Sequence, residues 1–469
     1  MAGECAIAIV GIGCRFAGCP TPEALWRTVL SGRSRLSVPG PDAEIPFGAK
    51  NIFDRQYPVR IGRLGDLYSC VPSMQNFPRQ VNAGENQDLY FATQMAFDAL
   101  ADATMRTHSR ETARGTVRIG YAPPFNSSTV NWLQHTAFLD QTMEIIRRFM
   151  PNAPEEALEA TRAQLKESLP EPVASSFLMG AGYRFASWIA RECSFGGEAT
   201  VLDAGMLSGA AAISGAMHDL RSGAADVALA GAITPPLGRS YLEGLSGEVQ
   251  FTAKTAFAPF SDTPDGTVPG EGGAIFVLKR REDALRSRDR IYALVKSVEI
   301  GHNPPDDPGA LLRAAIGNAG REPGDISLVE ADGSGIAAME AREIEAVKKT
   351  WGAREPGRAL AGIGSVKGNI GHTLKAAAAA GVAKAALALH HRVLPPQIAP
   401  ESPSAAFDDA SSSVYLLTEP RPWISGRRST PRAAAVMAAN FDPVQPIGDT
   451  SREGRAAVVV LEEEPESDA

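Results

Sequence analysis

Short apolar runs alternate with amphipathic segments along most of the chain. Runs rich in Val, Ile and Ala that end in glycine or polar residues predict buried strands, and apolar residues three and four positions apart predict helices. The predicted strands are 6–13, 116–122, 199–204, 225–234, 272–280, 293–301, 325–333, 359–368 and 456–465. The predicted helices are 21–34, 84–103, 180–192, 209–223, 307–320, 337–352 and 373–393. This alternation is typical of an α/β protein whose strands are mostly buried.

Two of the predicted helices consist almost entirely of small residues, "SGAAAISGA" at 208–216 and "AAAAAGVAKAALA" at 376–388. A helix that is apolar on every side needs close neighbours all round, so we expect both helices to lie between sheets. Each belongs to a block with a strand-helix-strand pattern, residues 1–255 and 256–469. The similarity between the blocks is weak, and the pattern alone leaves an internal duplication open.

A stretch of mixed charge at 128–171 interrupts the alternation. It predicts two helical pieces that Pro151 and Pro154 separate, because proline cannot continue a helix. We interpret this stretch as a helical excursion that covers the surface, with a partner interface as one use of it.

Composition and charge exclude several classes of protein. The chain has 469 residues and a formal net charge of −8, which argues against a surface for nucleic acid or anionic membranes. No uninterrupted apolar stretch reaches the roughly 18–20 residues of a membrane helix, and the N-terminus lacks the basic region of a signal peptide. The five cysteines show no metal-ligand spacing. We therefore expect a soluble, cytoplasmic protein with reduced thiols and no metal site.

The segment "TVLDAGMLSGAAA" at 200–212 predicts a strand, a tight turn and a small-residue helix. Several enzyme folds expose a nucleophile at such a turn. Here the turn offers only Gly205. The segment is either an ordinary turn or a catalytic elbow that has lost its nucleophile.

Four long stretches, in this order along the chain, carry a resemblance to one family. They are "IAIVGIGCRFAGCPTPEALWRTVLSGRS", "PFSDTPDGTVPGEGGAIFVLKRREDALRSRDRIYALV", "GSVKGNIGHTLKAAAAAGVAKAALALHHRVLPP" and "AAVVVLEEEP". Together they resemble the ketosynthase domain of modular polyketide synthases, in the β-ketoacyl synthase and thiolase superfamily. The resemblance implies a duplicated five-layer αβαβα fold, usually dimeric. It also implies that the phosphopantetheine arm of an acyl carrier protein delivers the substrate, with no other cofactor.

The family's chemistry uses a cysteine nucleophile and two histidines, with two backbone amides for the oxyanion. Against the family pattern "TVDTACSSSL" this chain reads "TVLDAGMLSG", which places Gly205 at the nucleophile position and Met206 after it. Ser208 keeps a hydroxyl, but no base is identifiable for it as a substitute nucleophile. The family's "EAHGTGT" is "EADGSGI" here, so Asp332 replaces the first histidine. Ser334 and Ile336 replace the threonines that bind the pantetheine arm.

The second histidine is retained as His372 in "GNIGHT", with Lys367 and Asn369. Family geometry places Asp332 near His372, and we expect this carboxylate to raise the pKa of the imidazole. The family's glycine-rich gating loop, "GFGGTNAH", is replaced by a longer segment that begins "MAANFDPVQP" and includes Phe441. Pro443 and Pro446 follow that phenylalanine and predict a stiffer loop.

These departures exclude ordinary decarboxylative Claisen condensation and leave two hypotheses. In the first, the protein is a non-catalytic pseudo-ketosynthase that pairs with an active ketosynthase, like a chain-length factor, or with a carrier protein. In the second, Asp332, His372 and Lys367 perform acid–base chemistry on a carrier-bound polyketide: cyclisation, dehydration, hydrolysis or acyl transfer. Gly205, Met206, Ser334, Ile336, Asn369 and Phe441 would then contact the substrate. We favour the second, because a new carboxylate beside a retained histidine suggests selection, and we expect a homodimer, with a heterodimer as the alternative. The sequence does not say whether the chain is a discrete protein or an excised domain.

Overall fold

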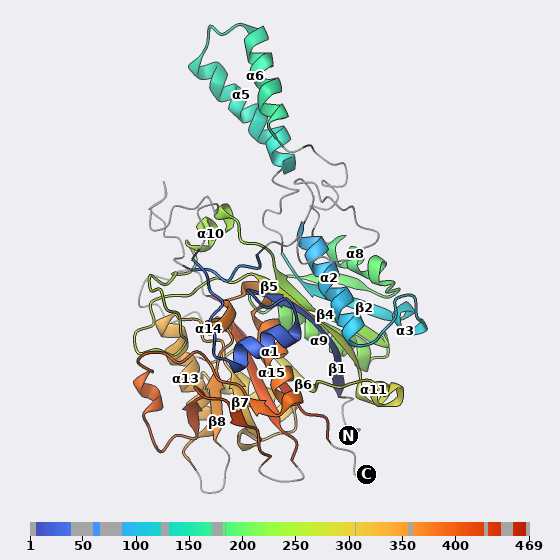
Figure 1. Cartoon of the computed structure of the whole chain (residues 1–469), viewed down its shortest axis with the longest axis vertical. Helices are drawn as coiled ribbons and strands as arrows, with labels where there is room; N and C mark the ends of the chain where they lie inside the picture. The colour runs from blue at the N-terminus through green and yellow to red at the C-terminus, as the bar shows by residue number, and fades with distance from the viewer. Residues whose placement is uncertain are drawn as a thin grey trace.

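The computed structural model describes residues 6–38, 60–65, 87–122, 131–169, 171, 182, 184–304, 306–354, 360–425, 430–441 and 454–465. In this part of the chain, eleven strands pair in the order β10-β8-β7-β12-β13-β6-β1-β5-β4-β2-β3. Helices lie between and outside the strands (Figure 1). Among the described residues, no helix is both long enough and apolar enough to cross a membrane.

The first group of strands comes from the N-terminal part of the chain. It contains β1 (Ile7–Phe16), β2 (Gly115–Gly120), β3 (Ala199–Leu202), β4 (Val227–Thr234) and β5 (Gly272–Arg280). β2 runs parallel to both β3 and β4, whereas β5 runs antiparallel to β4 and to β1.

The second group repeats this arrangement. It contains β6 (Ala293–His302), β7 (Ile326–Glu330), β8 (Ala361–Gly364), β10 (Val414–Leu416), β12 (Ala433–Ala439) and β13 (Arg455–Glu462). β7 runs parallel to β8 and β12, and β13 runs antiparallel to β12 and β6, so the order β8-β7-β12-β13-β6 matches β3-β2-β4-β5-β1. The repeated topology supports the duplication that the sequence pattern left open. The last strand of the first group, β5, ends at Arg280, and the first strand of the second group, β6, begins at Ala293. The division of the chain at 255/256 stays a prediction.

Two small-residue helices, α9 (Ser208–Arg221) and α15 (Ala377–His391), form the middle layer. The central core cluster joins Ile213 of α9 and Leu387 of α15 to Phe276 from the first strand group and Val459 from the second. The helices approach so closely that a Cβ on Gly209 would lie 3.0 Å from the amide nitrogen of Ala379. Larger residues would push the sheets apart, which explains the small residues in both helices.

Separate helices cover the outer faces. α2 (Gln87–Asp102) and α8 (Arg184–Cys193) pack on the first strand group, and α12 (Ala310–Asn318) and α13 (Ala337–Trp351) pack on the second. The predicted five-layer αβαβα architecture is thus confirmed. The remaining elements are α1 (Pro22–Leu30), α3 (Arg110–Ala113), α10 (Arg239–Leu245), α11 (Arg281–Ser287), α14 (Lys367–Ile370), β9 (Val393–Leu394), β11 (Arg421–Pro422) and four short helical turns, η1 (Gln134–Phe138), η2 (Pro323–Asp325), η3 (Leu374–Ala376) and η4 (Ala405–Phe407).

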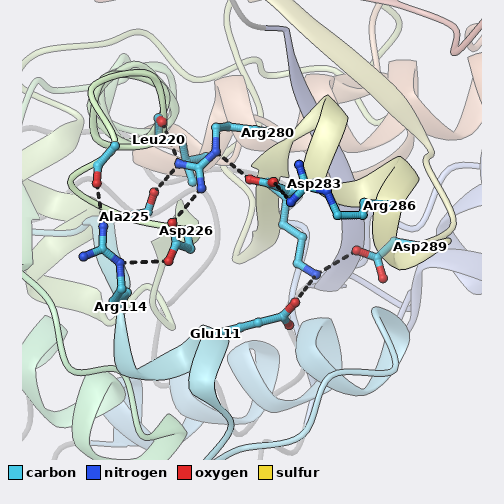
Figure 2. A network of polar contacts seen from close by, with 11 residues as sticks. Glu111, Arg114, Leu220, Ala225, Asp226, Arg280, Asp283, Arg286 and Asp289 are labelled. Atoms are coloured by element: carbon cyan, nitrogen blue, oxygen red, sulfur yellow. Dashed lines mark hydrogen bonds and ion pairs between the residues drawn. The ribbon is translucent and has the colours of Figure 1, made fainter.

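A polar network fixes the C-terminal end of α9 (Figure 2). The Arg280 guanidinium donates to the carbonyls of Leu220 and Ala225 at 2.9 and 2.7 Å. It also pairs with Asp226 at 2.6 Å, and Arg114 binds the other oxygen of that carboxylate at 2.8 Å. These contacts satisfy a carbonyl group in the last turn of α9 and tie the end of this helix to β5.

The helical excursion is a hairpin of α5 (Leu139–Phe149), which continues from η1, and α6 (Glu155–Glu167). Pro151 and Pro154 lie between the two helices, as predicted. The hairpin projects away from the body of the protein (Figure 1). The expectation that it covers the surface is therefore wrong: Leu139 and Met143 of α5 are buried with Leu158 of α6 within the hairpin.

Three of the five cysteines, Cys14, Cys19 and Cys193, are buried free thiols, as expected. Burial raises the pKa of each of these three thiols, which keeps them protonated. The other two, Cys5 and Cys70, lie outside the described residues.

Candidate functional site

The turn after β3 has the geometry of a nucleophile elbow. β3 ends at Leu202 and α9 begins at Ser208, so the strand, turn and helix lie where the sequence predicted them. Gly205 sits between them with φ +65°, a left-handed conformation that glycine adopts without steric cost. The backbone geometry of the elbow is retained, although Gly205 has no side chain to act as a nucleophile.

Asn440, directly after β12, fills the position that a side chain on Gly205 would occupy. A Cβ built on Gly205 would lie 2.6 Å from the Asn440 Oδ1 atom. This oxygen accepts a hydrogen bond from the Met206 backbone amide at 2.7 Å. The Gly205 amide donates to the Asp203 carboxylate at 3.1 Å. Both backbone donors at the elbow therefore already have acceptors from the chain itself.

Asn440 was not predicted as a site residue. Its only signal in the sequence is a polar side chain between an apolar strand and Phe441. Nothing local to residue 440 indicates that it meets residue 205, because 234 positions separate it from Met206.

The Ser208 hydroxyl is engaged in holding the turn. It accepts from the Ala204 amide at 3.0 Å and donates to the Gly205 carbonyl at 2.6 Å. The Ser208 side chain is fully buried. These contacts support a structural role for Ser208 rather than that of a substitute nucleophile.

His372 is fully buried beneath Phe441, whose ring centre lies 4.7 Å from that of the imidazole. The His372 Nδ1 atom accepts from the Leu374 amide at 3.1 Å, so the neutral ring carries its proton on Nε2. That Nε2 lies 3.9 Å from the Asp332 Oδ2 atom, beyond hydrogen-bond distance. Neither atom has a hydrogen-bond partner in the described part of the chain.

The expected rise in the pKa of His372 is wrong. Burial, together with the nearby Lys367 cation, lowers this pKa to about 3. The Asp332 carboxylate acts in the opposite direction but is outweighed. His372 is therefore a neutral imidazole across the physiological range of pH.

Asp332 pairs with Lys367 and not with His372. The Lys367 Nζ atom lies 2.9 Å from Asp332 Oδ1, and both residues are only 3% exposed. Lys367 also donates to the Asp332 carbonyl oxygen, and the Ala439 amide approaches Oδ1 at 3.3 Å. Two buried charges so close together compensate each other, and removal of one would leave the other unpaired.

Two glutamates on α13, the buried Glu340 and the partly buried Glu343, hold the loop that carries Asp332. Glu343 accepts from the backbone amides of Asp332 and Gly333, and Glu340 accepts from those of Gly335 and Phe260. Burial raises the pKa of Glu340 to about 7. Burial, followed by the nearby Asp332 charge, raises the pKa of Glu343 to about 8. These glutamates were missed because the sequence "AAMEAREIEAVKK" is typical of an ordinary amphipathic helix.

The residues predicted to contact substrate fall into separate environments. Met206, Ile336 and Phe441 pack into one apolar cluster. Ser334 lines a cavity of about 130 Å³ together with Asp332, Asn440 and residues of α12 and α13. The Asn369 side chain points elsewhere and donates to the Arg33 carbonyl at 3.0 Å.

The described residues contain no group of three or more His, Cys, Asp or Glu side chains that could hold a metal ion.

Two family descriptions match the chain. "Beta-ketoacyl synthase, N-terminal domain" matches residues 5–284, and "Beta-ketoacyl synthase, C-terminal domain" matches residues 295–401. The chain belongs to the β-ketoacyl synthase family. Together the two matches include the elbow, the Asp332 loop and the His372 motif.

Similar curated proteins are polyketide synthases. The phenolphthiocerol synthesis polyketide synthase type I Pks15/1 of Mycobacterium marinum is 29% identical over 487 residues, which cover 99% of this chain and 20% of the relative. The pikromycin polyketide synthase component PikAII of Streptomyces venezuelae is 29% identical over 99% of this ketosynthase-like chain and 12% of the relative. The chain thus spans a fifth or less of the length of these two relatives.

Solved ketosynthase domains share the fold. The ketosynthase from module 6 of the bacillaene synthase of Bacillus subtilis 168 has a TM-score of 0.73 at 23% identity, covering 98% of this chain and 72% of that one. The oxazolomycin ketosynthase domain OzmH KS7 of Streptomyces albus JA3453 has a TM-score of 0.76 at 23% identity, covering 99% and 75%.

Proposed function

We propose that this ketosynthase-fold chain does not catalyse decarboxylative Claisen condensation. It serves in polyketide assembly, in the cytoplasm, as a non-catalytic partner of an acyl carrier protein or of an active ketosynthase. The observation that carries this proposal is the closed elbow: Gly205 has no thiol, and Asn440 Oδ1 already accepts the Met206 amide.

Condensation through this elbow lacks two requirements. Acyl transfer needs a nucleophile, and a glycine supplies none. The tetrahedral intermediate also needs free N–H donors aimed at its oxyanion. At this elbow the Gly205 and Met206 amides donate to Asp203 and Asn440 instead. An acyl thioester that entered would have to displace both acceptors.

A second function, acid–base catalysis, is favoured by one observation. His372 Nε2 and Asp332 Oδ2 face each other at 3.9 Å, and neither has a partner among the described residues. A substrate group placed between them would meet a neutral donor and a carboxylate acceptor. Such a pair could move a proton in cyclisation, dehydration, hydrolysis or acyl transfer of a chain on a phosphopantetheine arm. The cavity beside Asp332 and Ser334 supports access for such an arm.

Intact-protein mass spectrometry separates the two functions. The chain is incubated with a polyketide-acyl thioester of an acyl carrier protein, and the mass of the acyl group is followed. Asp332→Asn and His372→Asn test the pair, and Asp408→Asn is the matched control because Asp408 is exposed. The non-catalytic proposal expects an unchanged acyl mass with all four proteins.

A mass change that the Asp332→Asn and His372→Asn variants lose and the Asp408→Asn variant keeps would establish the acid–base function instead. The partner role has its own measurement. Co-expression with an active ketosynthase should yield a 1:1 heterodimer, or the chain alone should bind the acyl carrier protein in calorimetry. Failure of both binding measurements would remove the partner role.

A further inference from the structure

A cavity of about 420 Å³ lies beside α1, and three of its five lining residues are arginines. Ala24 and Arg27 come from α1, and Ser31 caps the C-terminal end of this helix. Arg33 and Arg35 belong to the segment that follows. The other side of α1 is buried in the central core, so the side that carries the arginines is the one that meets solvent.

The three arginines form no ion pair with a carboxylate in the described part of the chain. Arg27 Nε donates to the backbone carbonyl of Glu23 at 3.3 Å and not to its carboxylate. Arg35 Nε donates to the hydroxyl of Thr28 at 3.1 Å. The Arg33 side chain is exposed. The terminal N–H groups of these guanidiniums are therefore available to a ligand.

Several arginines elsewhere in the described chain have a carboxylate partner. Arg118, for example, binds Asp219 at 2.8 Å and Glu198 at 2.9 Å. Neighbouring guanidiniums without such a partner repel one another, because like charges close together are unfavourable. An anion that binds among them removes this repulsion and accepts charge-assisted hydrogen bonds. The cavity beside α1 thus has the properties of an anion site.

The backbone that carries two of the arginines is held in place by α14. The Asn369 side-chain amide donates to the Arg33 carbonyl at 3.0 Å, and the Arg35 amide donates to the Asn369 carbonyl at 2.7 Å. These two hydrogen bonds hold the segment on both sides of residue 34. Binding therefore has to order the guanidiniums but not the backbone, which lowers the entropic cost of recognition.

A phosphate group is the anion that fits this set of donors best. A phosphate monoester carries a charge of about −1.5 to −2 and three acceptor oxygens, so it can meet several guanidiniums at once. A carboxylate has one charge and two oxygens. An extended polyanion such as a nucleic acid is disfavoured by the net charge of −8 on the whole chain. The cavity volume also falls within the range of roughly 300–1,000 Å³ that is typical of small-molecule sites.

We propose that the cavity beside α1 binds a phosphate group, either free or carried by a small molecule. Arg27, Arg33 and Arg35 supply the charged donors, and the Ser31 hydroxyl supplies a neutral one. None of the five lining residues belongs to the elbow or to the cavity beside Asp332. The site is thus an additional one, and it does not depend on the proposed function.

Phosphorus NMR titration of the full chain at low ionic strength tests this site. Phenyl phosphate and inorganic phosphate are the two probes, and benzoate is the competitor. Both probes should show a saturable shift with one site per chain, and benzoate should displace phenyl phosphate only at a roughly tenfold higher concentration. Tighter binding of phenyl phosphate would indicate a phosphorylated small molecule, whereas equal binding of the two probes would indicate free phosphate. Absence of a saturable shift with both probes, or equally effective binding of benzoate, would overturn the proposal.

Arginine variants locate the binding at this cavity. Arg27→Gln and Arg33→Gln should each weaken phenyl phosphate about tenfold, because each removes a charge-assisted hydrogen bond. Arg33→Lys should weaken it less, since the charge remains and only the planar fork is lost. Arg110→Gln is the matched control, because Arg110 is an exposed arginine on α3. Circular dichroism should show all four variants folded. Binding that Arg27→Gln and Arg33→Gln leave unchanged, or that Arg110→Gln weakens equally, would place the phosphate elsewhere and refute the site.

Discussion

The close contact between Gly205 and Asn440 can be tested by adding a single methyl group at residue 205. Gly205→Ala adds a Cβ at a residue with φ +65°, at a point 2.6 Å from Asn440 Oδ1. A contact this short forces the Asn440 amide to move. Its hydrogen bond to the Met206 amide, 2.7 Å long in the native protein, is then lost.

Two separable effects determine how much Gly205→Ala destabilises the protein. A non-glycine residue in the left-handed region costs about 1–2 kcal/mol. Loss of a hydrogen bond that leaves the partly buried Met206 amide unpaired costs about 1–3 kcal/mol. We therefore expect Gly205→Ala to lower the free energy of unfolding by about 2–5 kcal/mol.

Urea titration with a matched glycine isolates the contact with Asn440. Gly223 has φ +75°, and a Cβ there would meet nothing within 4 Å. Gly223→Ala should therefore carry the backbone cost alone, about 1–2 kcal/mol. In an Asn440→Ala background, Gly205→Ala should become as mild as Gly223→Ala, because the obstructing amide is gone.

The double-mutant cycle also defines what would refute this reasoning. If Gly205→Ala is no more destabilising than Gly223→Ala in the native background, Asn440 does not occupy the elbow. The same conclusion follows if Asn440→Ala leaves the cost of Gly205→Ala unchanged. Either result would remove the main support for a closed elbow.

Three further predictions concern the residues around His372. Lys367→Met leaves the Asp332 carboxylate buried and unpaired, so the free energy of unfolding in urea should fall by about 3–5 kcal/mol, and a fall below about 1 kcal/mol would contradict the ion pair. Because the pKa of His372 is about 3 in the folded protein and 6.5 without burial, its contribution to stability is complete above pH 6.5 and is lost as the pH falls towards 3. Urea midpoints of His372→Phe should accordingly depend less on pH in this window than those of the native protein, and parallel curves would show that His372 is not held neutral. Phe441→Ala should expose the imidazole to diethylpyrocarbonate, which peptide mapping should find unreactive at His372 in the native protein; modification of native His372 would show that Phe441 does not cover it.

Local patterns in the sequence predicted the α/β class, and the resemblance to the family implied the five-layer architecture. Apolar runs and helical periodicity depend on neighbouring residues, so they predicted most of the strands, the elbow and the small-residue helices. They missed β10 and the alanine-rich strand β12, whose place in the sheet depends on pairing with distant segments. The evidence for the duplication came from the sheet topology, because strand order depends on pairing between segments that are distant in the sequence. The projecting hairpin shows the same limit: its prolines predicted where the helices end, but not which way they point.

For the candidate site as well, the sequence determined some features and the tertiary structure determined others. The sequence by itself determined that the elbow carries Gly205 in place of a thiol and that Asp332 replaces a histidine, since residue identity needs no fold. Only the tertiary structure decided that Asn440 fills the vacated position, because a contact across 234 residues is made by folding. It also decided the protonation of His372. A pKa depends on what surrounds the group, and complete burial beside Lys367 outweighs the carboxylate of Asp332.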